Sequence, residues 1–115
     1  MAGGAALAAL ASSAALADTP RAYAAGAISA GQLVEAERIL QPVNFEDARD
    51  PARLVNIATV YARTQRYADA RAALLRVQAL PAEPLDLAGG VSLSSHRLAG
   101  AMLARLDDGT RLSAR

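Results

Sequence analysis

The sequence predicts a mainly α-helical (all-α) fold, built from about two helical hairpins, a small β-hairpin and a C-terminal capping helix. Between Asp50 and Pro81, two apolar stripes with the 3.6-residue period of a helix follow each other across a short polar turn. A similar pattern precedes it in residues 19–43, and an alternating pattern around Gly89 and Gly90 comes later. With 115 residues and no cysteine, the chain can form one small domain that no disulfide stabilises.

Residues 1–17 carry no charged side chain and are interpreted as a signal peptide. Ala15-Leu16-Ala17 has the small-x-small form of a signal-peptidase site and directly precedes Asp18. The apolar stretch is shorter than the roughly 20 residues that span a bilayer, so no stable membrane anchor is expected after cleavage. We expect cleavage after Ala17 and a periplasmic or secreted protein. Because the segment lacks Lys and Arg, the alternative is a cytoplasmic protein with an Ala-rich first helix.

Residues 18–50 are expected to form a degenerate first hairpin. Its second helix, GQLVEAERILQPV, carries apolar and charged residues at helical spacing, whereas its first, PRAYAAGAISA, contains Gly26. A glycine inside a helix costs about 1 kcal/mol relative to alanine. The polar connector that follows contains Phe45, the only phenylalanine of the chain, which we expect to pack under the loop.

Residues 51–84 are expected to form the second hairpin, whose pattern is the clearest. Asp50 can cap its first helix, and Pro51 suits a first helical turn, where a missing N–H costs nothing. Small residues in each stripe allow the two backbones to approach closely, while larger residues fill the space around them. The first stripe comprises Leu54, Ile57, Ala58 and Tyr61, and the second comprises Tyr67, Ala70, Leu74 and Val77.

These positions together resemble the tetratricopeptide repeat (TPR), whose unit is a helix–turn–helix of about 34 residues. Leu54 stands where the family prefers tryptophan, Gln65 where it usually has glycine, and Pro81 where the closing proline is expected. The other matches are Ile57 and Ala58 with the Leu-Gly pair, Tyr61 and Tyr67 with the aromatic positions, and Ala70 with the small residue. The chain therefore resembles a short, exported bacterial TPR-like protein.

Comparison of the chain with itself extends this resemblance to the first hairpin. A shift by one repeat length also aligns acidic residues and the two turns. Chance matching between Ala-rich segments is the alternative, but the register of the larger apolar residues argues against it. The shift places Ala70 on Ala36, Leu74 on Leu40, Val77 on Val43 and Gln65 on Gly31.

The last part of the chain departs from the repeat pattern. Residues 85–93 alternate around a glycine pair and predict a small β-hairpin. Residues 94–107 predict a helix that caps the exposed apolar end of the repeats, and residues 108–115 a frayed tail. Ser94 or Ser95 is expected to cap this helix, which should bury Leu98, Met102 and Leu106 (or Leu103).

The sequence shows no recognisable catalytic constellation, so we expect no enzyme. The alternative is a small hydrolase that uses His96 with Ser94 or Ser95, but no nucleophile elbow is present. No cofactor is expected either. The acidic connector before the second hairpin lacks the spacing of a calcium loop, so no metal is expected. Twelve arginines balance eleven acidic residues without a basic block, which does not favour nucleic acid.

The resemblance implies instead a binding surface formed by the first helix of each repeat. In some TPR proteins, basic and Asn side chains on these helices hold a peptide's C-terminal carboxylate; Arg21 and Asn56 match two of those positions. Thr59 and Arg63 lie toward the same face by their spacing. We therefore expect a non-catalytic protein–protein interaction module of the cell envelope. Its partner is a protein, a peptide or a second copy of itself.

Overall fold

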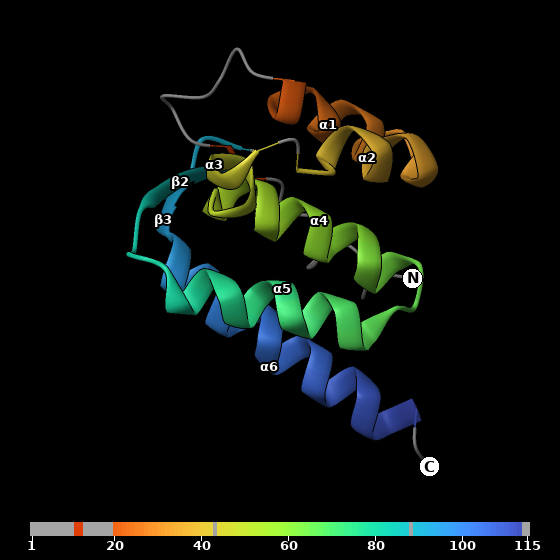
Figure 1. Ribbon diagram of the computed structural model, residues 1–115. Helices are drawn as coiled ribbons and strands as arrows, with labels where there is room; N and C mark the ends of the chain where they lie inside the picture. The colour runs from red at the N-terminus through yellow and green to blue at the C-terminus, as the bar shows by residue number, and fades with distance from the viewer. Residues whose placement is uncertain (1–10, 13–19, 43, 88, 114–115) are drawn as a thin grey trace.

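Helices make up most of the part of the chain that the structure describes, as the sequence predicts, and a small antiparallel sheet completes it (Figure 1). The computed structural model describes residues 11–12, 20–42, 44–87 and 89–113, with side chains described within 24–109. In order, the elements are β1 (Ala11–Ser12), α1 (Pro20–Ser29), α2 (Leu33–Leu40), α3 (Phe45–Ala48), α4 (Pro51–Arg63), α5 (Tyr67–Ala79), β2 (Pro84–Leu87), β3 (Ser92–Ser94) and α6 (Ser95–Ser113).

The longer helices form a row in which each packs against the next one along the chain (Figure 1). Thus α1 contacts α2, α2 contacts α4, α4 contacts α5, and α5 contacts α6. Helix α4 also touches α1, α6 and β1. Because other elements surround α4, residues 51–60 are all buried, including their polar side chains.

The ends of α4 are set by local sequence. The Asp50 carboxylate accepts a hydrogen bond from the Ala52 N–H at 3.0 Å, and Pro51 occupies the first turn, as predicted. The turn after α4 places Gln65 at φ 64°, and the turn after α1 places Gly31 at φ 79°. These are the two positions that the self-comparison of the sequence aligns. Glycine adopts this left-handed conformation freely, whereas other residues pay roughly 1–2 kcal/mol.

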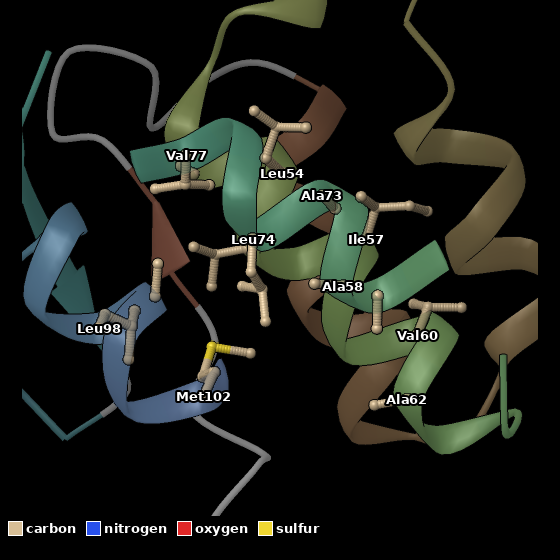
Figure 2. Close-up of a cluster of buried hydrophobic side chains, with 14 of the residues drawn as sticks. Leu54, Ile57, Ala58, Val60, Ala62, Ala73, Leu74, Val77, Leu98 and Met102 are labelled. Carbon is tan, nitrogen blue, oxygen red and sulfur yellow. The ribbon is translucent and has the colours of Figure 1, made fainter. Parts of the chain in front are cut away.

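The hydrophobic core extends from α1 and α2 to α6, and Figure 2 shows the part where α4, α5 and α6 meet. The small residues Ala58 and Ala70 are fully or almost fully buried, which fits their predicted role at a close approach of two helices. Leu74 lies near the middle of the labelled cluster (Figure 2). The cluster includes Leu54, Ile57 and Val60 from α4, Ala73, Leu74 and Val77 from α5, and Leu98 and Met102 from α6.

Two aromatic side chains do not lie where the sequence placed them. Phe45, expected under the loop, is 71% exposed, and the Arg49 guanidinium lies 5.2 Å from its ring centroid. The short helix α3 buries Asp47 and leaves the Phe45 ring on its exposed side. Tyr67, expected in the apolar stripe, is 38% exposed because it begins α5 at the turn end of the hairpin. The expected burial of both rings was therefore wrong.

Strands β2 and β3 form the predicted hairpin, with Leu85 opposite Leu93. A partner that the sequence did not predict, β1, pairs antiparallel with the other edge of β2, so the strand order is β1-β2-β3. Its residues belong to the expected signal peptide, 1–17, which otherwise lies outside the described residues. The described part of this segment is therefore extended and paired.

Helix α6 buries Leu98, Met102 and Leu106, as predicted. It continues to Ser113, however, well beyond the expected end at residue 107. One glycine, Gly109, weakens a helix by about 1 kcal/mol but does not end it when helix-compatible residues follow. Among the helices that the structure describes, none combines the length and apolar character that crossing a membrane requires.

Candidate functional site

A groove of about 350 Å³ lies where the segment after α2 meets α4 and α5. Its floor is apolar and includes Leu54 and Ile57 from α4 and Ala73 from α5. Gln41 and Pro42 line the side that belongs to the segment after α2. Grooves with an apolar floor and a polar rim are typical of surfaces that bind another molecule.

Helix α5 forms one rim of the groove. Asp69, Ala72, Ala73 and Arg76 recur at three- and four-residue spacing and therefore share one face of the helix. This arrangement puts a carboxylate toward one end of the rim and a guanidinium about two turns further along. The Arg76 Nε donates a hydrogen bond to the Ala48 carbonyl at 3.2 Å, which ties this rim to α3.

The Tyr61 side of the groove is held by a polar network. The Arg66 guanidinium lies over the Tyr61 ring, 4.7 Å from its centroid. The same guanidinium forms a bidentate ion pair with the Glu37 carboxylate, with one N–O distance of 3.1 Å. This hydrogen bonding lowers the pKa of the Glu37 carboxyl and raises the pKa of Arg66. The pair thus connects α2 to the turn after α4 and orients the tyrosine.

The opposite end of the groove is held by Arg53, which is buried at the start of α4. Its Nη1 donates to the Leu40 carbonyl and its Nε to the Asp47 carbonyl, both at 2.7 Å. The last carbonyls of a helix have no partner within that helix. Because Leu40 ends α2, the arginine satisfies one of these carbonyls and fixes the end of α2 beside α4.

Two of the four residues expected to bind a partner are buried, whereas a third, Arg63, is exposed at the end of α4. Asn56 is 1% exposed and Thr59 is fully buried, with its hydroxyl donating to the Val55 carbonyl at 3.1 Å. Arg63 donates to the Ile28 carbonyl at 3.1 Å and so joins α4 to α1. Arg21 lies in α1, and its side chain is outside the described part. The expected accessibility of Asn56 and Thr59 was wrong, because α4 is packed on several sides rather than along one.

The side chains proposed for the alternative hydrolase, Ser94, Ser95 and His96, contact backbone groups at the start of α6. The Ser94 hydroxyl accepts from the His96 N–H at 3.2 Å, which is the predicted capping role. Ser95 is buried, and its hydroxyl accepts from the Glu83 N–H at 2.9 Å. The His96 Nε2 lies 2.6 Å from the Leu80 carbonyl oxygen. These bonds anchor α6 to the segment between α5 and β2.

Sequence reasoning missed the groove, although one signal was available. Asp69, Ala72 and Arg76 fall beside the buried stripe of α5, at the spacing of a second helix face. Nothing in their local sequence shows that α2 ends across from them.

Within the described ranges, no three side chains of the His, Cys, Asp or Glu type gather as they would around a metal ion. No family model, curated protein sequence or solved structure matches the chain.

Proposed function

We propose that the chain is a non-catalytic interaction module of the cell envelope, in which a TPR-like helical scaffold docks a protein or peptide partner. The observation that supports this most is the groove between α4, α5 and the segment after α2, with its apolar floor and charged rim. Ala72, which lines the groove, is exposed, and Leu75 on the same helix is 50% exposed. Exposed apolar surface next to polar residues is typical of a docking site for another chain.

The TPR-like part of the proposal is supported by matching positions in the two hairpins. Ala36 and Ala70, which the self-comparison aligns, are both fully buried. Leu40 and Leu74 are equivalent in the same way, at 0% and 1% exposed. The turns that contain Gly31 and Gln65 adopt the same left-handed conformation. Together with the packing of each helix on the next, these equivalences favour repeated helical hairpins.

The groove also suggests the chemistry of the partner. An amphipathic segment would bury its apolar side against Leu54 and Ile57. A basic residue of that segment would suit the end near Asp69, and an acidic residue would suit the end near Arg76. This charge order gives the segment one preferred direction along the groove. The proposal of export to the envelope rests on the predicted signal peptide. The intact mass of the native protein tests it, because the mature chain should begin at Asp18.

Affinity capture with matched surface variants tests the docking proposal. Ala72 lines the groove on α5, whereas Ala101 is an exposed alanine on α6 outside it. We expect Ala72→Glu to abolish capture of a specific partner from native envelope extract, because the larger side chain narrows the groove and places a carboxylate against the apolar side of the partner. Ala101→Glu should capture that partner as wild type does. If the two variants capture the same proteins in the same amounts, the groove is not the docking site.

A further inference from the structure

The edge of β2 that faces away from β3 is occupied by an extended segment of the chain itself. β1 pairs antiparallel with this edge, with Ala11 opposite Leu87 and Ser12 opposite Asp86. β1 also contacts α1 and α4. The segment therefore touches both the sheet edge and the row of helices, at a place separate from the groove between α4, α5 and the segment after α2.

The hydrogen-bonding direction of β2 shows which backbone groups this edge offers. The Leu87 N–H donates to the Val91 carbonyl at 2.7 Å, on the β3 side of the strand. Successive residues of a strand direct their backbone groups to opposite edges. The N–H and carbonyl of Asp86 consequently face β1, where Ser12 lies opposite. An edge that presents such groups pairs readily with another extended segment.

We propose that the β1-facing edge of β2 is a strand-acceptor site. It takes an extended segment of small residues as an additional antiparallel strand, and Ala11–Ser12 fill it in the full chain. Small residues suit the site because the incoming strand must also fit against α1 and α4. Main-chain hydrogen bonds supply the affinity, as in other cases of strand addition.

Cleavage after Ala17, which belongs to the proposed function, would remove β1 and leave this edge open to a partner strand. Before cleavage, the chain's own segment has the advantage of being tethered, because a tether replaces the partner concentration by an effective concentration in the millimolar range. The acceptor site itself rests on the pairing of β1 with β2. Its existence depends on neither the cleavage nor the groove.

Disulfide trapping tests the site in the full chain, which contains no native cysteine. Asp86 and Ser92 are exposed and lie opposite each other on β2 and β3, so Asp86→Cys and Ser92→Cys are matched variants. The probe is a synthetic peptide of residues 8–16 with the Ser12→Cys change, activated as a mixed disulfide. A strand added beside β2 lies about 5 Å from position 86 but about 10 Å from position 92, beyond the roughly 7 Å limit for a disulfide.

We expect the Asp86→Cys chain to form the peptide adduct at least about tenfold faster than the Ser92→Cys chain, measured by intact mass, because binding raises the local thiol concentration. The peptide is added at about millimolar concentration, so that it competes with the tethered β1 strand. Equal rates in the two chains then overturn the proposal. Equal rates of adduct formation are expected if the peptide binds elsewhere or does not bind. Both substitutions replace exposed polar residues, so each chain is expected to remain folded.

Competition by the chain's own strand provides a second arm in the Asp86→Cys background. Ser12→Pro removes an N–H that faces β2, whereas Ala11→Pro removes one that faces away from it. We expect Ser12→Pro to release β1 and speed adduct formation several-fold, and Ala11→Pro to leave the rate near that of the parent. No increase with Ser12→Pro, or the same increase with both, overturns the proposal. If circular dichroism shows that Ser12→Pro does not fold, the comparison of positions 86 and 92 decides alone.

Discussion

The junction between α2 and α4 and the junction between α5 and α6 both bury apolar side chains, but the first depends more on hydrogen bonds. At the first, Arg53 donates to the Leu40 carbonyl, and Arg66 pairs with Glu37. At the second, apolar side chains such as Leu74 and Met102 pack in one cluster (Figure 2), and only a half-exposed ion pair between Arg71 and Asp107 accompanies them. Hydrogen bonds are directional and contribute modestly to net stability, whereas apolar burial is non-directional and contributes most of the driving force.

This difference has a consequence for the groove. The groove opens beside the junction between α2 and α4, so hydrogen bonds from arginine determine where its walls stand. The apolar junction between α5 and α6 holds the opposite side of the stack together. Loss of the apolar junction should therefore unfold the protein, whereas loss of the arginine contacts should first loosen the groove.

The largest expected effect is that of Leu74→Ala in the apolar junction. Leu74 is almost fully buried, so the change should lower the free energy of unfolding by about 2–5 kcal/mol. Leu75→Ala is the matched control, because this neighbour is half exposed and its change should cost within about 0.5 kcal/mol. Urea denaturation measures both. Equal losses for the two variants would mean that the cluster at the junction contributes little.

The second expected effect is that of Arg53→Met, which keeps much of the side-chain length but removes both hydrogen bonds. Two carbonyls lose a charged donor, so we expect a loss of about 2–3 kcal/mol. Arg105→Met, at an exposed position on α6, should be nearly neutral. Amide hydrogen exchange should show that Arg53→Met loosens α2 more than α5. Equal loosening of both helices would contradict a role confined to this junction.

A smaller effect is expected for Asn44→Ala, at the start of α3. The Asn44 side chain accepts from the Asp47 N–H at 2.8 Å, and loss of such a cap costs about 1 kcal/mol. Asn44→Ser retains an acceptor and should preserve most of the stability. Thermal unfolding of the two variants distinguishes these outcomes. A loss of the same size with serine would show that the hydrogen bond is not what matters at this position.

The smallest expected effect concerns pH and the pair between Glu37 and Arg66. Because folding lowers the pKa of Glu37, the pair stabilises the protein above the ordinary glutamate pKa of about 4.3, and this contribution disappears as the pH falls through the lowered value. For a partly exposed pair it should remain under about 1 kcal/mol. Glu37→Gln should therefore be less stable than wild type at pH 6, with the difference shrinking toward pH 3. A difference that grows on acidification would contradict this sign.

Much of the helical framework was predictable because its signals are local. The cap at Asp50, the stripe that contains Leu74 and the buried side of the last helix follow from spacing and from residue type. The β-hairpin was predictable for the same reason, since a glycine pair separates two alternating segments. Each of these signals lies within one short, continuous segment of the sequence.

The groove was not predictable, because its residues come from three separate segments. Asp69 and Arg76 look like ordinary solvated residues of α5 until the segment after α2 is placed beside them. The expected accessibility of Asn56 and Thr59 was wrong for a related reason. A periodic pattern indicates that one face of a helix is buried, but it does not show how many neighbours the helix has.

By itself, the sequence determined the helical class, the positions of the main turns and the apolar stripes, because backbone preferences and side-chain periodicity act over short distances. Only the tertiary structure decided that α4 is enclosed, that Phe45 is exposed and that Ala11–Ser12 pair with the edge of β2. These outcomes depend on which segments meet across the chain. The packing of distant elements sets them, through the burial and hydrogen bonding that become available when the segments come together.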